Sequence, residues 1–208
     1  MICYLSGMNT SSLPDLSPLQ LRKRSAILDG AKTVFLSQGF GLATMDDVAA
    51  AACVGKQTVY RHFKSKEALF VGLVSEMCAQ VGVLLAGAQG EQTDGASEVE
   101  LRKLGWMLAR SLITPDYLRL YRAIVAEAER LPELGQVFYE NGAKVVRAFA
   151  AQILRKRFDD STAALRAATF VQLVLGDAYL ELSIGYAVPN VEARFALQID
   201  EAVAAALR

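Results

Sequence analysis

The stretch VGKQTVYRHF, residues 54–63, gathers two cations, an amide and two aromatic rings around Val59. It also contains the only histidine of the chain. At about 100° per residue, a helix over this stretch turns Val59 and Phe63 to one side, and Gln57 and Arg61 to the opposite side. The stretch therefore predicts a short helix that packs through an apolar face and offers an amide and a guanidinium outward.

The outward side chains of this helix suit the edges of DNA bases. Glutamine can form two hydrogen bonds with adenine, and arginine can form two with guanine. Lys56, Thr58, Tyr60 and Lys66 are donors that suit phosphate oxygens, and helix starts such as the one at Thr44 also favour anions. A solvated surface is the commoner meaning of such a face, so the surrounding elements have to decide.

Helix signals surround the stretch in a fixed order. Thr44-Met-Asp-Asp is a capping box that opens a short helix ending near Ala52, and a three-residue turn follows. Ser65 caps a third helix, whose apolar stripe continues to Gly87. Two short helices joined by a tight turn, the second with a polar outer face, predict a helix-turn-helix.

The rest of the chain is also expected to be helical. An apolar face at Ile27, Ala31, Val34 and Phe35 predicts a helix that ends at Gly39. Residues 87–97 have the composition of a loop. Further helices are expected at 97–113, 116–130, 132–157, 162–186 and 191–207. The fold is therefore predicted to be all-α, with about nine helices.

Composition excludes several classes of protein. Hydrophobic residues make up 53% of the chain and charged residues 21%, which is typical of a globular protein. Three cysteines stand at no metal-ligand spacing, and the N-terminus does not have the pattern of a signal peptide. The window 171–188, which we take as the most apolar, contains three polar residues that a membrane span avoids. We expect a cytoplasmic protein with no metal, no cofactor and no membrane contact.

The formal net charge of zero hides an asymmetry along the chain. Residues 1–70 carry eight Lys or Arg against five Asp or Glu, whereas the remainder carries 14 against 17. A cationic N-terminal part on an anionic body suggests that only the N-terminal part meets a polyanion.

Together these residues resemble the DNA-binding domain of the tetracycline-repressor (TetR/AcrR) family. The resemblance covers about residues 20–75 and rests on Gly39-Phe, on Thr44-Met-Asp-Asp-Val-Ala-Ala and on the run from Val54 to Phe70. It implies an all-helical homodimer with an N-terminal three-helix helix-turn-helix domain and a larger helical domain for ligand binding and dimerisation. Carried over position by position, it implies DNA contacts at Thr44, Lys56, Gln57, Thr58, Tyr60, His62 and Lys66. Arg61 joins this set because it shares the outward face with Gln57.

The turn departs from the family pattern. The family usually has Ala-Gly-Val-Ser there, and this chain has Ala52-Cys53-Val54-Gly55. Cys53 puts a side chain where a left-handed backbone is often needed, at a cost of about 1 kcal/mol. Glycine is a tolerable substitute for the capping serine. Gln57 replaces a commonly small residue, so the resemblance leaves the operator sequence open.

Residues 115–190 resemble an AefR-like C-terminal regulatory domain, which implies that this part senses an unidentified small-molecule effector. The expected organisation is a flexible tail at 1–17, a DNA-binding domain at 18–66, a connecting helix at 67–87 and an effector-binding and dimerisation domain at 88–208.

The apolar helices at 162–186 and 191–207 predict a four-helix homodimer interface. Candidate effector-binding residues are Trp106, Tyr121, Phe138, Phe149, Phe170, Gln172, Asp177 and Tyr179, although core packing or simple exposure is the commoner role of each.

Two other functions remain open. A small helical enzyme finds little support, since one histidine without a companion base and without a phosphate-binding glycine motif predicts no catalytic residues. An oxidant-responsive regulator could sense through Cys53, which lies in the turn near Lys56, although a small buried residue is the commoner role of a cysteine. The interpretation that fits most features is a DNA-binding transcriptional regulator, a repressor that a small ligand releases from its operator.

Overall fold

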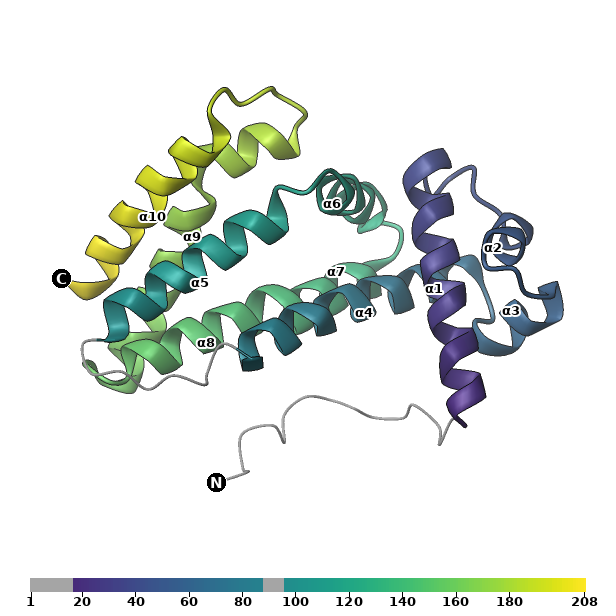
Figure 1. The fold of residues 1–208 in the computed structure, drawn as a ribbon, viewed down its shortest axis with the longest axis horizontal. Coiled ribbons are helices and arrows are strands. Elements are labelled where there is room, and N and C mark those ends of the chain that lie inside the picture. The colour runs from purple at the N-terminus through teal and green to yellow at the C-terminus, as the bar shows by residue number, and fades with distance from the viewer. Residues whose placement is uncertain (1–16, 88–95) are drawn as a thin grey trace. The chain divides into compact units, whose positions relative to one another are not determined.

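The structure, a computed structural model, describes residues 17–87 and 96–208, and every regular element within these ranges is a helix. The all-α prediction is confirmed for this part of the chain. The expected tail at 1–17, apart from Ser17, and most of the expected loop at 87–97 lie outside the described residues. The helices are α1 (Pro18–Gln38), α2 (Met45–Ala51), α3 (Lys56–His62), α4 (Lys66–Gly87), α5 (Ala96–Leu112), α6 (Pro115–Glu127), α7 (Pro132–Phe138), α8 (Lys144–Leu154), α9 (Asp160–Ser183) and α10 (Val191–Leu207) (Figure 1).

One expected helix is divided in two. Residues 132–157 were expected to form a single helix, but a π-helical turn, η3 (Tyr139–Ala143), separates α7 from α8. The described residues therefore contain ten α-helices where about nine were expected. Such wide turns are rare and often occur at functional sites.

The chain forms two compact units whose boundary lies inside α4, after Met77. The N-terminal unit contains α1, α2, α3 and the first part of α4, around an apolar core. Three rings occupy this core: Phe35 lies 5.5 Å from Phe40 and 5.3 Å from Phe70, and the rings of Phe40 and Phe70 stack at 4.8 Å. Ring pairs at these separations stabilise a core beyond the area that they bury.

Close backbone packing joins the helices of this unit. A Cβ atom placed on Gly30 of α1 would lie 2.9 Å from the backbone nitrogen of Ala52, at the end of α2. A Cβ atom on Gly72 of α4 would lie 2.7 Å from the ring of Phe63. Glycine at these two positions lets α2 approach α1, and lets Phe63 lie against α4.

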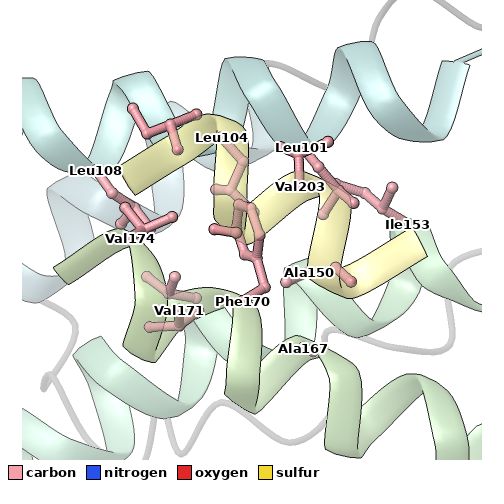
Figure 2. Close-up of a cluster of buried hydrophobic side chains, with 14 of the residues drawn as sticks. Leu101, Leu104, Leu108, Ala150, Ile153, Ala167, Phe170, Val171, Val174 and Val203 are labelled. Atoms are coloured by element: carbon pink, nitrogen blue, oxygen red, sulfur yellow. The ribbon is translucent and has the colours of Figure 1, made fainter. Parts of the chain in front are cut away.

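In the C-terminal unit, α8, α9, α10 and α5 pack around a second core. Figure 2 shows Leu101, Leu104 and Leu108 of α5 gathered with Phe170 and Val174 of α9. The Phe170 side chain is fully buried.

Helix α4 is the one described helix long and apolar enough to cross a membrane, with a mean hydropathy of 1.9 over Lys66–Leu85. The expectation that the most apolar window lies at 171–188 was therefore wrong. The first turns of α4 nevertheless belong to the core of the N-terminal unit, where Leu69, Phe70 and Val74 are fully buried. A core helix of a soluble protein has this same composition.

Candidate nucleic-acid interface

The capping box at the start of α2 forms as predicted. The Thr44 hydroxyl accepts a hydrogen bond from the Asp47 amide at 3.1 Å, and the Thr44 amide donates to the Asp47 carboxylate at 3.0 Å. The hydroxyl also donates to this carboxylate at 2.6 Å. These bonds fix the angle at which the chain enters α2, and they leave Thr44 exposed at the helix start.

The turn between α2 and α3 contains a residue whose backbone conformation is unfavourable for any side chain other than that of glycine. Cys53 has a φ of 51°, in the left-handed region, and its side chain is exposed. The amides of Cys53 and Val54 donate to the carbonyls of Ala50 and Ala49, each at 3.1 Å. Gly55 caps α3 without a side-chain hydrogen bond. The turn is thus closed by backbone hydrogen bonds, with a strained residue at its centre.

The two faces of α3 lie as the helical wheel predicted. Val59 is fully buried and Phe63 is 5% exposed, whereas Gln57, Tyr60 and Arg61 are exposed. Because only its apolar face is anchored, α3 presents an amide and a guanidinium to solvent.

Two lysines proposed as DNA contacts have partners inside the unit. Lys56 forms an ion pair with Asp46 at 2.8 Å, and this hydrogen-bonded carboxylate raises the pKa of Lys56. The Lys66 ammonium donates to the carbonyls of Phe40 at 2.7 Å and Gly41 at 3.2 Å, and it lies 4.6 Å above the Phe40 ring. Lys66 therefore holds the loop before α2, a role that the sequence did not reveal.

The single histidine lies between α3 and α1. His62 is half-buried, and its Nε2 atom is inaccessible and has no hydrogen-bond partner among the described residues. Burial lowers the pKa of His62, and the nearby charges of Arg61, Arg24 and Lys23 lower it further. The charges of these three cations therefore act on a half-buried imidazole and disfavour its protonation.

The candidate effector residues fall into separate places in the C-terminal unit. Tyr121 of α6 lies 5.8 Å from the Phe138 ring of α7 and 5.6 Å from the Tyr179 ring of α9. Tyr117, which the sequence did not single out, stacks on Tyr121 at 6.5 Å, one helical turn earlier. These four residues form the aromatic cluster.

The other candidates lie elsewhere. Trp106 lines a groove of about 550 Å³ along α5, where the Arg110 guanidinium lies 5.5 Å from its ring. Phe170 belongs to the core, and Phe149 packs against that core. Gln172 and Asp177 are exposed.

Hydroxyl groups in the aromatic cluster are shielded from water. Burial raises the pKa of Tyr117 far above its usual value and that of Tyr179 to about 12, and the proximity of Tyr179 raises the pKa of Tyr117 further. The buried thiol of Cys78, whose pKa burial raises to about 11, would lie 3.2 Å from a Cβ atom on Gly142 of η3. The π-helical turn thus lies against α4.

A break in α9 precedes Tyr179. Gly176 has a φ of 44° and a ψ of −157°, outside the helical region, and a side chain there would collide with the Gln198 amide. Gln198 of α10 donates to the Leu175 carbonyl at 3.3 Å, a carbonyl at the break. A glycine is required at this position because of its positive φ.

Among the described residues, no group of His, Cys, Asp or Glu side chains could hold a metal ion.

Models of known protein families match both units of the chain. The family model "Bacterial regulatory proteins, tetR family" matches residues 27–73. The model "AefR-like transcriptional repressor, C-terminal domain" matches residues 99–208, more than half of the chain. The first match falls within the N-terminal unit and the second within the C-terminal unit.

Similar proteins agree with these matches. A structure assigned to the TetR family from Mesorhizobium loti is 28% identical, with a TM-score of 0.80, covering 92% of this chain and 98% of that one. The flavonoid-responsive regulator FrrA is 30% identical, with a TM-score of 0.67, covering 89% of this chain and 93% of that one. The HTH-type transcriptional regulator YvkB of Bacillus subtilis is 31% identical over 86 residues. This match covers 41% of the chain and 43% of YvkB, less than half of that relative.

The left-handed residue in the turn gives a stability prediction. Replacing Cys53 by glycine should raise the free energy of unfolding of the N-terminal unit by up to about 1 kcal/mol, because glycine adopts a positive φ without steric cost. Hydrogen exchange of the α2 and α3 amides would measure the change. Cys53→Ser is the matched control, since it keeps the Cβ atom and should leave the strain in place; an equal gain in both variants would contradict this explanation.

The histidine gives a pH prediction. Its imidazole, the only one in the chain, should titrate by NMR below the ordinary value of about 6.5. Between pH 6.5 and the lower native pKa, the unfolded chain binds a proton that the native chain does not. The free energy of unfolding should therefore fall as the pH falls through this window. A midpoint at or above 6.5 would show that the imidazole is not shielded as described.

Proposed function

Because the chain belongs to the tetR family of bacterial regulatory proteins, we propose that it is a cytoplasmic repressor that a small molecule releases from its operator. The observation that carries the proposal is the outward face of α3, where Gln57 and Arg61 are exposed on a helix anchored by Val59. The unit ending at Met77 supplies the DNA-binding domain, and the unit beginning at Cys78 supplies effector binding and dimerisation.

In this proposal the DNA contacts divide into two groups. Gln57 and Arg61 contact base edges in the major groove. Phosphates are bound by the residues around them: Thr44, Lys56, Thr58, Tyr60, His62 and Lys66. The Thr44 hydroxyl donates to Asp47 and Lys56 is paired with Asp46. Each must give up this partner before it can bind a phosphate.

A second copy of the chain is proposed to pack against α9 and α10. Leu165, Leu180 and Leu197 on these helices are 70%, 59% and 73% exposed. A group of large apolar side chains exposed on two neighbouring helices is typical of an interface. Two helices from each protomer would form a four-helix contact that places two DNA-binding units on one operator.

The effector is proposed to bind at the aromatic cluster and to be a planar aromatic molecule with hydroxyl groups. Four rings offer stacking surfaces, and the buried hydroxyls of Tyr117 and Tyr179 offer hydrogen-bond partners. The flavonoid-responsive regulator FrrA, which is 30% identical, supports this ligand class.

DNA reading can be tested on the duplex directly upstream of the gene that encodes this chain. Gln57→Ala should relax the preference at one base pair by about 1–3 kcal/mol, because it removes a two-bond contact to a base. Tyr60→Phe should weaken binding to all sequences alike, because it removes only a phosphate donor. Gel-shift titration on single-base variants of the duplex measures both effects. The proposal fails if the wild type shows no salt-sensitive, sequence-preferring complex up to micromolar protein.

The interface can be tested by placing a charge on it. Leu197→Glu should shift the chain from dimer to monomer in analytical ultracentrifugation, because burying an unpaired carboxylate is unfavourable. Val125→Glu is the matched control, since Val125 is 59% exposed on α6, outside the proposed interface. A wild type that is monomeric at micromolar concentration would contradict the proposal, and so would a Leu197→Glu variant that remains dimeric.

Ligand binding can be tested with a panel of flavonoids, with saturated fatty acids of similar mass as the comparison. A flavonoid in excess should raise the unfolding temperature and weaken DNA binding, whereas the fatty acids should do neither. Tyr121→Ala should weaken flavonoid binding by about tenfold or more, because Tyr121 contacts the other three rings of the cluster. Trp106→Ala tests the groove on α5; if it alone abolishes binding, the ligand site is that groove.

A further inference from the structure

The cations of the N-terminal unit differ in whether they already have partners. Lys56 is paired with Asp46, and Lys66 is bound to two backbone carbonyls. Lys23, Arg24 and Arg61 form no hydrogen bond or ion pair with any other described residue. The two lysines that motif spacing assigns to phosphate are therefore occupied, whereas Lys23, Arg24 and Arg61 are not.

These unoccupied cations gather where α1 meets the end of α3. Lys23 and Arg24 of α1 lie close enough to His62 for their charges to act on it, and Arg61 is its neighbour in sequence. We call Lys23, Arg24, Arg61 and His62 the α1–α3 seam. The one carboxylate that acts on Arg24 is Glu76 of α4, and it forms no ion pair with Arg24. The seam is therefore a concentration of positive charge that the unit itself does not neutralise.

Arg24 is already held in position. Its guanidinium lies 4.6 Å from the centre of the Phe63 ring, and it is half-buried. Its N–H groups nevertheless have no acceptor among the described residues. A guanidinium stacked on a ring keeps its edges available for two parallel hydrogen bonds to a phosphate. Because stacking has already restricted the side chain, little rotamer entropy remains to be lost on binding.

We propose that Lys23 and Arg24 of the α1–α3 seam bind the DNA phosphate that flanks the base contacts of α3, so that α1 also contacts the operator. Arg61, at the same end of α3, adds to the local positive charge. His62 lies within reach of these charges, and they lower its pKa. The inference rests on the proposed DNA-binding function, and it adds two phosphate contacts on a helix to which the motif assigns none.

The seam also predicts how DNA binding changes the pKa of His62. The charged groups that act on His62 are Arg61 on its own helix, and Arg24 and Lys23 on α1. A phosphate bound between these residues offsets their positive charge, so protonation of the imidazole becomes less unfavourable. The NMR titration midpoint of His62 should therefore rise when duplex DNA is added.

The decisive experiment is the salt dependence of binding by the full chain, measured by fluorescence anisotropy between 50 and 200 mM salt. The probes are a labelled duplex from directly upstream of its own gene and an unrelated duplex of equal length. Arg24→Met keeps a side chain of similar length against Phe63 but removes the donors. It should lower the slope of log affinity against log salt by about one per subunit, equally on both duplexes. Lys23→Gln should act in the same direction.

Controls separate this contact from general charge effects and from misfolding. Arg22→Gln removes a neighbouring exposed cation outside the seam and should change the slope less than Lys23→Gln. Arg24→Lys should restore part of the slope, because the charge returns without the paired geometry. Circular dichroism must show that each variant is folded. If Arg24→Met is unfolded, the salt dependence of Lys23→Gln and the NMR titration of His62 with DNA test the proposal instead.

The outcomes distinguish a failure of the proposed DNA-binding function from a failure of the proposed phosphate contact. If the wild type binds neither duplex in a salt-dependent way, the DNA-binding function itself fails. If the wild type binds but folded Arg24→Met and Lys23→Gln keep its slope, the seam does not contact phosphate. A loss equal to that of Arg22→Gln would also overturn the proposal, since it would show only a diffuse effect of net charge.

Discussion

The burial of one face of α3 is the constraint on which the DNA-binding unit depends. Val59 is fully enclosed, and Phe63 lies against Gly72 of α4, where any larger side chain would meet its ring. Removing these apolar surfaces from water fixes the rotation of a seven-residue helix that could not persist alone. Because the rotation is fixed, Gln57 and Arg61 point outward. The outward orientation of Gln57 and Arg61 is therefore a consequence of core packing.

The same packing assigns the charged residues to different tasks. Lys66 binds the carbonyls of Phe40 and Gly41 and so holds the loop that leads to Thr44 and the start of α2. Lys56 pairs with Asp46 in α2 and links the two short helices. Arg24 lies on Phe63 without an acceptor for its hydrogen-bond donors. The N-terminal unit thus contains cations that already have polar partners and cations that have none among the described residues.

Local sequence predicted the features that depend on local physics. The period of α3 predicted that Val59 is buried, and the spacing of Thr44 and Asp47 predicted a capping box. The left-handed backbone at Cys53 was implied by the family resemblance and not by the local residues. Features that depend on distant residues could not be predicted. The break at Gly176 is completed by Gln198 of another helix, and the π-helical turn lies against Cys78 of α4. Of the candidate effector residues, Tyr121, Phe138 and Tyr179 come together, while Phe170 lies in a core that only the fold defines.

In the proposed function, two copies of the α3 face read one operator. Hydroxyl-radical footprinting of the duplex bound by the full chain measures how many copies of this face contact the DNA. A dimer should protect two half-sites related by two-fold symmetry, with centres about one helical turn, or a multiple of it, apart. Uniform protection along the duplex without a repeated half-site, or a single unpaired protected site, would contradict it.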